Sequence, residues 1–317
     1  MYKKFYGLTR SAFEISPDPY FYYGTPDHNE ALAVVTYGVL RRKGFVVVTG
    51  EVGTGKTLLV RCLFEVLSRN QAAFAYVYNP ILSVPEFLVH VLNDLGLQAG
   101  VRPKVEMLSR LNNYLVARSL KGGTTALIVD EAHLLTWELF EEIRLLTNLE
   151  TSQNKLLQIV LVGQPELDER LDSQELRQLK QRVSLRRRLE PLSLREVQGY
   201  IRRRLELAGA NSHATTLFSD DCILAIHEFS MGIPRLVNTL CENSLVYGYS
   251  TQAKQITRAM VQEVAAELRL DVIQHAAGPE SGDVKERRNT LTLLNELRQT
   301  SRHSADDIRL ESYMKTE

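Results

Sequence analysis

Apolar residues along the first part of the chain form short continuous runs that alternate with stretches of helical spacing. Runs of strand length that are apolar throughout are typical of strands buried on both faces of a parallel sheet. Such runs cover 45–49, 73–78, 125–129 and 156–163, and a more polar candidate for a short fifth strand follows Arg182 over 183–189. The intervening spacing predicts helices over 28–39, 58–67, 84–95, 107–120, 137–149 and 171–181. Strands that alternate with helices predict an α/β fold, a parallel sheet flanked by helices.

The strand pattern stops near Pro191. Ser193 and Glu196 form a capping-box pair that opens a helix to about residue 207, and further helical patterns cover 218–229, 233–247 and 257–268. After Pro279 the composition turns polar, with Leu291, Leu294 and Leu297 at helical spacing. We expect an α/β domain over 1–190, a smaller all-helical lid domain over 191–272, and a polar linker with a marginal helix over 273–317. That tail either docks a partner or is disordered.

The charge balance gives no global preference for nucleic acid or for a membrane surface. The 317 residues hold 38 Lys plus Arg and 38 Asp plus Glu, a formal net charge of zero. Cys62, Cys222 and Cys241 are widely spaced in apolar segments, so we expect reduced thiols in the core. The sequence has no signal-peptide pattern and no apolar run long enough for a membrane span. We therefore expect a cytoplasmic protein, and peripheral docking at the inner membrane through a partner stays open.

The first chemical signal is the stretch that joins the 45–49 run to the next helix. Its glycines allow the backbone to turn tightly so that successive N–H groups face an anion, and the helix start adds the positive end of its dipole. Lys56 can reach the β- and γ-phosphates of a nucleotide, and the Thr57 hydroxyl is placed to bind Mg²⁺. The predicted phosphate-binding loop consists of Gly50, Glu51, Val52, Gly53, Thr54, Gly55, Lys56, Thr57 and Leu58.

A second signal follows the 125–129 run, which ends in Asp130 and Glu131. In open parallel sheets ligands gather at the carboxyl ends of the strands, so both carboxylates are expected beside the loop. Asp130 would hold Mg²⁺, largely through water, and Glu131 would act as general base on an attacking water. His133 either hydrogen-bonds these carboxylates or simply lies on the following helix.

The N-terminal stretch over 6–23 is rich in aromatic residues and proline and has no clear periodicity. We expect an extended arm that lies on the core. It either only packs there or also supplies an apolar slot for an adenine ring. The helix after it has Thr25 or Asp27 as its N-cap, and His28 is interpreted as a surface or capping histidine rather than a ligand.

Three further polar residues are candidates for the same site. Gln164 follows the fourth run, where its side chain would hydrogen-bond the attacking water or the γ-phosphate, or satisfy loop backbone groups. Arg182 precedes the fifth run, where ring-forming ATPases place an arginine that reaches the γ-phosphate of a neighbouring subunit. Arg235 lies at a helix start that favours an anion, which a γ-phosphate would supply. The cluster Lys180 to Arg188 is either a solvated basic face or an anion- or DNA-binding patch.

With these residues in place, the chain from Tyr2 to about Leu270 resembles the AAA+ ATPases of the general secretion pathway protein A type. Within that family it resembles the subgroup encoded beside exosortase and exopolysaccharide genes. The motifs that carry the resemblance are Phe5 to Leu8, Pro17 to Pro19, His28 with Glu30 to Leu32, Tyr37-Gly38, Gly50 to Thr57, Val129 to His133, Val162 to Leu167, Gln181-Arg182 and Gly232 to Arg235.

The resemblance implies a set of roles, which we write for the matching positions. These are ATP phosphate binding by Gly53, Gly55, Lys56 and Thr57, Mg²⁺ binding and water activation by Asp130 and Glu131, a sensor at Gln164, an arginine finger at Arg182 and a second sensor at Arg235. Members that serve type II secretion continue into a membrane span and a peptidoglycan-binding domain. Neither follows the matched core in this sequence, which weakens any claim of a role in wall remodelling.

These observations predict an AAA+ ATPase that hydrolyses ATP with Mg²⁺ and forms a homo-oligomer through the nucleotide site. Its hydrolysis would drive or switch a secretion or exopolysaccharide-export assembly, which implies a protein partner. The same core also resembles ATPases that bind DNA and regulate transposition target selection, and this is the alternative. A nucleotide-dependent scaffold with negligible turnover is a third hypothesis.

Overall fold

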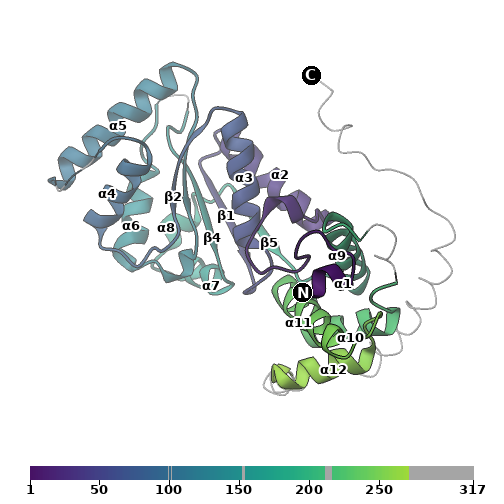
Figure 1. Cartoon of the computed structure of the whole chain (residues 1–317). Coiled ribbons are helices and arrows are strands. Elements are labelled where there is room, and N and C mark those ends of the chain that lie inside the picture. Colours follow the sequence, from purple (N-terminus) through teal and green to yellow (C-terminus); the bar gives the residue numbers. More distant parts are fainter. Residues whose placement is uncertain (99, 101, 152–153, 211–215, 271–317) are drawn as a thin grey trace. The chain divides into compact units, whose positions relative to one another are not determined.

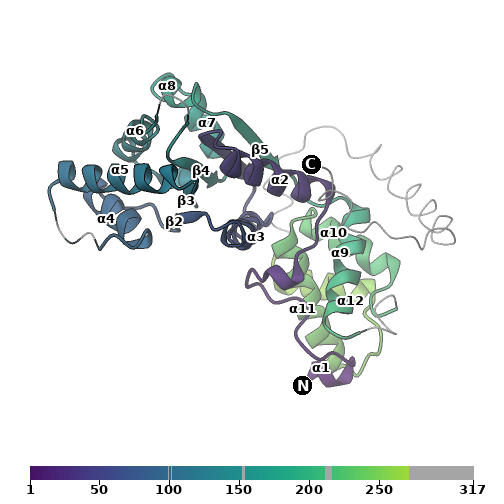
Figure 2. The ribbon, with the colours of Figure 1, turned by 90° about the horizontal axis from the view of Figure 1, so that it is seen from above.

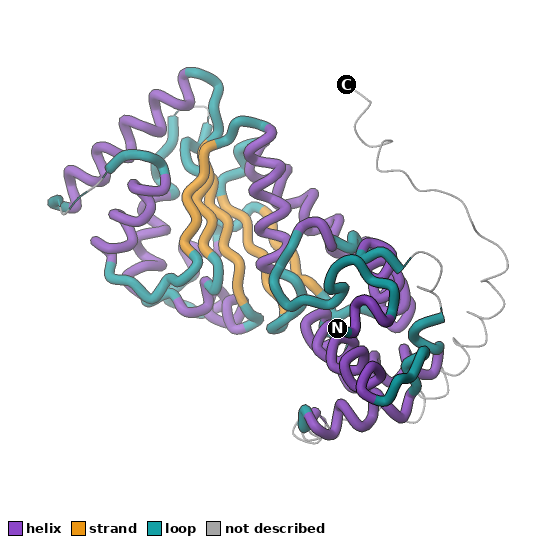
Figure 3. Tube along the Cα trace, in the orientation of Figure 1, coloured by secondary structure: helices purple, strands orange, loops and turns teal. Residues whose placement is uncertain are grey.

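The computed structural model describes residues 1–98, 100, 102–151, 154–210 and 216–270. These residues form a five-stranded sheet in the order β2-β3-β4-β1-β5, in which all four strand pairs are parallel. Figure 3 shows the strands side by side. The predicted α/β fold with a parallel sheet is confirmed, and the short fifth strand pairs with β1 at the edge. The strands are β1 (Phe45–Gly50), β2 (Ala73–Val77), β3 (Thr125–Val129), β4 (Gln158–Gly163) and β5 (Leu185–Leu189).

Alternate residues of β1 to β4 pack into two separate cores, one on each face of the sheet, and β5 contributes to one of them. Phe45 and Val47 of β1 belong to one core, while Val46 and Val48 belong to the other. β1, β3 and β4 are buried on both faces, which explains why these strands are largely apolar, whereas the edge strand β5 carries three arginines. Figures 1 and 2 show the sheet between two layers of helices. One layer is α2 (Pro26–Leu40) and α3 (Lys56–Arg69), and the other is α4 (Val84–Asp94), α5 (Lys104–Leu120), α6 (Trp137–Leu146), α7 (Glu166–Asp172) and α8 (Arg177–Lys180).

The helix predicted over 171–181 is wrong, because the chain forms two short helices there. α7 ends at Asp172, and α8 begins only at Arg177. Ser173 between them is extended, with φ −64° and ψ 156°, so the helical hydrogen-bond ladder cannot run through it. The break allows Leu171 of α7 and Leu179 of α8 to reach the same core.

Four helices follow β5 in the described part of the chain. Ser193 opens the first of them through the predicted capping box, in which its backbone N–H and its Oγ donate to Glu196 at 2.8 and 2.7 Å. The last three pack against one another. The helices are α9 (Leu194–Leu207), α10 (Asp220–Ser230), α11 (Pro234–Ser250) and α12 (Arg258–Glu267).

Residues 1–269 form one compact unit. The division of the chain at residue 190 stays a prediction, and the tail predicted over 273–317 lies outside the described residues. All three cysteines are buried and none is in a disulfide. No described helix combines the length and the apolar character that crossing a lipid bilayer requires.

The N-terminal arm packs against the helices that follow the sheet. It contains the short helical turn η1 (Pro19–Phe21) and is preceded by the short helix α1 (Tyr2–Phe5), and the aperiodic sequence predicted neither. Phe13 is fully buried, with its ring centroid 5.9 Å from that of Phe218. Thr9 Oγ1 donates to the Ala208 carbonyl at 2.9 Å. The arm is therefore held to the helices by both apolar and polar contacts.

Candidate functional site

The loop between β1 and α3 turns on two glycines. Gly53 and Gly55 have φ of +85° and +103°, in the left-handed region where a residue with a Cβ is strained. A Cβ on Gly53 would lie 2.7 Å from Cβ of Arg235, and a Cβ on Gly55 would lie 3.3 Å from Nε2 of His28. Both positions therefore require glycine, and the loop leads directly into α3 at Lys56.

Lys56 is the first residue of α3 and is buried. Its Nζ donates to the carbonyl oxygens of Gly50 at 2.7 Å and Glu51 at 2.9 Å. Burial lowers the pKa of Lys56, and the nearby carboxylates of Glu131 and Asp130 oppose that shift. The ammonium lies at a helix N-terminus, which carries a partial positive charge of its own. Together these charges suit an anion such as a phosphate group.

Asp130, directly after β3, is 3% exposed and accepts three hydrogen bonds. Its Oδ2 accepts from Thr57 Oγ1 at 3.2 Å and from the Tyr76 hydroxyl at 3.1 Å, and its Oδ1 accepts from the Glu131 backbone N–H at 2.9 Å. Burial raises the pKa of Asp130, and these bonds partly offset the shift. Burial also raises the pKa of Tyr76, so its hydroxyl stays a donor.

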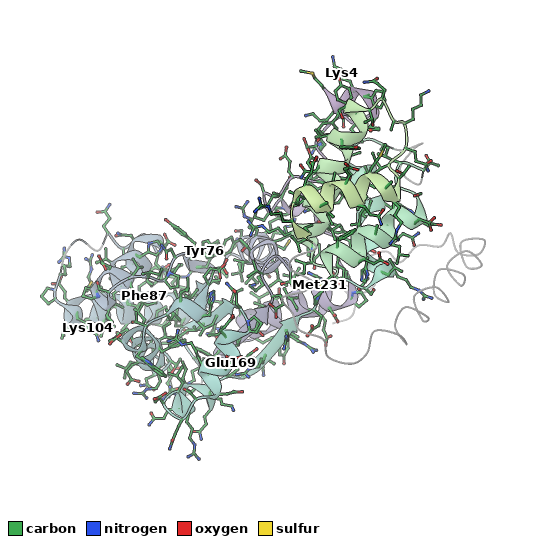
Figure 4. All side chains as sticks on the ribbon, turned by 90° about the horizontal axis from the view of Figure 1, so that it is seen from below. Lys4, Tyr76, Phe87, Lys104, Glu169 and Met231 are labelled. Carbon is green, nitrogen blue, oxygen red and sulfur yellow. The ribbon has the colours of Figure 1, made fainter. Side chains whose placement is uncertain are left out.

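Tyr76 was not identified by sequence analysis. It lies on β2, opposite Ile128 of β3, and Figure 4 labels its side chain. No local pattern marks this tyrosine, since its relation to Asp130 depends on β2 pairing with β3. Tyr76 is the one residue with a polar side-chain group in the run Ala73 to Val77, and this was the only signal that the sequence offered.

The oxygens of Thr57 and Asp130 fit a Mg²⁺ site of the kind completed by a nucleotide. Mg²⁺ prefers oxygen ligands and usually combines one or two protein groups with phosphate oxygens and water. In the described part of the chain, no group of three or more His, Cys, Asp or Glu side chains could hold a metal ion by itself. A magnesium ion here would therefore depend on phosphates for the rest of its ligands.

Glu131, His133 and Gln164 form a connected group next to Lys56. Glu131 has a left-handed backbone, φ 49° and ψ 36°, which is uncommon for a residue other than glycine. Its Oε2 lies 3.5 Å from Nδ1 of His133, and the His133 Nε2 lies 3.0 Å from Nε2 of Gln164. His133, in the short turn η2 (Ala132–Leu134), thus contacts one of the two carboxylates and links it to Gln164.

A pocket of about 350 Å³ opens beside these residues. Lys56, Thr57, Glu131 and Gln164 line it, and Arg235 lines it from the first turn of α11. The Arg235 backbone N–H donates to the Gly53 carbonyl at 3.2 Å, which joins α11 to the loop. Most of the residues predicted for one site are therefore brought together, with Val52 and Leu58 of the predicted loop among the other lining residues.

A second wall of the pocket comes from the N-terminal arm and from two helices after the sheet. The arm contributes Ile15, Pro17 and Phe21. Tyr200 and Arg204 of α9 and Asn238 of α11 complete this wall. None of these three helical residues was selected from the sequence, because their own segments show only ordinary amphipathic spacing.

Arg182 lies apart from this group. It is not among the residues that line the pocket, and its Nη1 donates to the Thr147 hydroxyl after α6. Its position is just before β5, as the sequence predicts.

The arginines of β5 are paired with carboxylates. Arg186 lies 3.4 Å from Asp168, Arg188 lies 3.3 Å from Glu190, and Arg187 contacts Glu30. Lys180 lies 3.0 Å from Asp172. This arrangement supports the interpretation as a solvated basic face, because carboxylates neutralise the charges that a DNA phosphate would need.

The interpretation of His28 as a surface residue is wrong. His28 is only 6% exposed, with Nδ1 2.8 Å from Thr25 Oγ1 and Nε2 2.9 Å from the Thr54 carbonyl. Thr25 is the N-cap of α2, so the capping half of the interpretation holds. The histidine supports the loop from the N-terminus of α2, a contact between segments that local spacing cannot reveal.

The chain has a parallel sheet in which β1 leads through a glycine-rich loop into α3, and the acidic pair Asp130 and Glu131 follows β3. These features define a P-loop ATPase of the AAA+ class. The solved structures with this fold include Cdc6p of Pyrobaculum aerophilum, with a TM-score of 0.63 and 19% identity over 81% of this chain and 70% of that one. RuvB of Thermotoga maritima is similar with a TM-score of 0.53 and 18% identity over 82% of this chain and 74% of that one. At these identities the likeness concerns the fold alone.

The sequence comparisons identify the family. Residues 40–171 match the model of the AAA domain. General secretion pathway protein A of Aeromonas hydrophila is 39% identical over 269 residues, 84% of this chain. The chain belongs to the AAA ATPases, in the group related to general secretion pathway protein A. It spans 48% of the length of that relative.

Proposed function

We propose that this protein binds ATP with Mg²⁺ and hydrolyses it, and that hydrolysis drives or switches an assembly for secretion or exopolysaccharide export. The observation that carries the proposal is the convergence of Lys56, the Thr57–Asp130 pair, Glu131 and Arg235 on one pocket. A cation, oxygen ligands for a metal, a carboxylate base and a second cation are the groups that phosphoryl transfer to water requires.

Each residue has a separate role in this mechanism. Lys56 and the N-terminus of α3 bind the β- and γ-phosphates, while Thr57 and Asp130 would hold a Mg²⁺ ion, whose charge would offset that of the phosphate oxygens. Glu131 takes the proton of the attacking water, and Gln164, held by His133 at 3.0 Å, orients that water or the γ-phosphate. Arg235 contacts the γ-phosphate from α11, so the same phosphate connects the loop with that helix.

We assign Arg182 to a neighbouring subunit's site. It does not line the pocket of its own chain, and it lies on the turn that leads into the edge strand β5. An arginine that stabilises transition-state charge in trans makes hydrolysis depend on assembly. The proposal therefore includes a homo-oligomer in which each nucleotide lies between two chains.

The partner part of the proposal rests on the similarity to the Aeromonas relative. A cytoplasmic location, with docking at the inner membrane through a protein partner, agrees with such a role. A chromosomal Lys56→Ala allele in the source organism should lower the amount of secreted protein or exopolysaccharide in the medium. Unchanged amounts of both would refute the export role while leaving ATP hydrolysis untouched.

The hydrolysis step is tested by phosphate release from Mg²⁺–ATP with the full chain and with Glu131→Gln. Glu169→Gln is the matched control, since Glu169, labelled in Figure 4, is an exposed carboxylate on α7 and is not among the residues that line the pocket. We expect Glu131→Gln to lower turnover by about a hundredfold or more while ATP still binds, with no change in the control. Equal background rates in all three proteins would instead support a scaffold without turnover.

A further inference from the structure

Arg204 of α9 is a buried cation without a carboxylate partner. It is 5% exposed, and no Asp or Glu in the described residues lies within salt-bridge distance of it. Burying a charge costs free energy unless hydrogen bonds replace the lost water. An apolar side chain would anchor two segments at less cost, so the charge itself calls for an explanation.

Within the described part of the chain, two of the four hydrogen bonds that the guanidinium group donates go to the N-terminal arm. Its Nε donates to the Ala12 carbonyl at 2.7 Å, and its Nη2 donates to the Glu14 carbonyl at 3.4 Å. Its central carbon lies 4.8 Å from the ring centroid of Phe21, within the range of a cation–π contact. One side chain thus holds both the backbone and an aromatic ring of the arm.

The other side of Arg204 is joined to α11. The Arg204 Nη1 donates to the Asn238 side-chain oxygen at 3.1 Å and to the Tyr200 hydroxyl. The Tyr200 hydroxyl in turn donates to the same Asn238 oxygen at 2.8 Å. Asn238 lies one helical turn after Arg235, which lines the phosphate part of the pocket. The arm is therefore fixed relative to the helix that carries Arg235.

Arg204, Tyr200, Asn238 and Phe21 all line the same pocket as Lys56. A nucleotide that places its phosphates on the loop must place its nucleoside elsewhere in this pocket. The wall fixed by Arg204 offers it an aromatic ring, apolar arm residues and backbone groups, which are the features that bind a planar base.

We propose that Arg204 is a positioning residue that fixes the arm as the wall for the nucleoside of the bound nucleotide. Its effect is to make affinity depend on the nucleoside, so that the pocket distinguishes ATP from inorganic triphosphate. This inference rests on the proposed nucleotide binding and names a determinant of ligand selection in that site.

The test is calorimetric titration of the full chain with Mg²⁺–ATP and, separately, with inorganic tripolyphosphate and Mg²⁺. Arg204→Met keeps the length of the side chain but removes the charge and the donors. Arg203→Met is the matched control, since Arg203 is the neighbouring exposed arginine of α9. We expect Arg204→Met to lower ATP affinity by about tenfold to a hundredfold and to leave tripolyphosphate affinity within about twofold. The control should change neither affinity.

Two further measurements keep the inference testable if Arg204→Met does not fold. Tyr200→Phe retains Arg204 and the aromatic ring but removes one acceptor, and it should weaken ATP binding selectively by about threefold to tenfold. In phosphate-release assays either variant should raise KM for ATP without lowering kcat.

Equal losses for ATP and tripolyphosphate, or no loss of ATP affinity, would overturn the role of Arg204. A wild-type chain that binds neither ligand would instead refute the proposed nucleotide binding, and with it the inference. The two failures are therefore distinguishable.

Discussion

The backbone N–H of Arg235 donates to the Gly53 carbonyl at 3.2 Å, and a Cβ added to Gly53 would lie 2.7 Å from Cβ of Arg235. The phosphate loop and the first turn of α11 therefore touch through their backbones. Glycine at position 53 serves two needs, a left-handed turn and room for α11.

Gly53→Ala should weaken ATP binding through loss of this contact. A left-handed alanine costs about 1–2 kcal/mol, and the clash with Arg235 adds to it by forcing the loop and α11 apart. Gly96→Ala is the matched control, because Gly96 has φ +78° and nothing within 4 Å of the added Cβ. Thermal unfolding should show both variants destabilised, and ATP titration should show a loss only for Gly53→Ala. Equal ATP affinities would show that the Arg235 contact does not shape the site.

Tyr76→Phe should raise the Mg²⁺ concentration needed for half-maximal ATPase activity. The tyrosine hydroxyl donates to Asp130 Oδ2 at 3.1 Å, so its removal leaves the carboxylate less well oriented. One hydrogen bond of about 1 kcal/mol corresponds to a change of about fivefold. Tyr78→Phe, on a tyrosine that is 66% exposed, is the control and should have no effect. If magnesium titrations of the two variants coincide, Tyr76 has no part in holding the ion.

Arg182→Ala should abolish turnover and leave ATP binding intact, because its guanidinium would act in a neighbouring chain. Mixing it with Lys56→Ala protein should restore part of the activity, since a mixed oligomer contains sites with an intact lysine and an intact arginine. Absence of rescue in oligomers shown to be mixed would count against the assignment.

Thr147→Val distinguishes a role of Arg182 in the neighbouring subunit's site from a structural role in its own chain. The Thr147 hydroxyl accepts a hydrogen bond from Arg182, so the valine variant frees the arginine without removing it. Phosphate release should stay within about twofold of wild type, as is usual for the loss of one modest hydrogen bond. A loss of turnover as complete as in Arg182→Ala would mean that the arginine acts by supporting its own turn.

Cys62→Ala should reduce the loss of folding stability that the protein undergoes as the pH is raised. Burial raises the pKa of Cys62 from 9.0 to about 11. The folded chain thus keeps a proton that the unfolded chain releases, so this contribution to stability is complete below pH 9 and is lost as pH rises to about 11.

Urea unfolding at about pH 8 and about pH 10.5 measures the effect as a difference in free energy of unfolding. Cys62→Ala should lose less stability between the two conditions than wild type. Ser68→Ala, an exposed position on the same helix, should show the same loss as wild type. Identical losses in all three proteins would contradict the raised pKa.

Much of the fold is visible in local pattern. The runs over 45–49 and 125–129 are strands because four of the five residues in each are apolar, and the structure buries both faces. The capping box at Ser193 likewise requires only two residues three positions apart. The helix over 171–181 failed because its leucines meet one core from two separate helices, a detail of packing rather than of periodicity.

The sequence by itself determined the phosphate loop, the acidic pair at Asp130 and the strands and most helices that carry them, because these depend on neighbours along the chain. Only the tertiary structure decided that Tyr76 bonds Asp130, that His28 supports the loop and that Arg204 joins the arm to α11. Those contacts depend on strand order and on helices packing across long sequence separations. The spacing of residues along the chain does not predict these contacts, since the same residues would show the same periodicity if their segments packed against different elements.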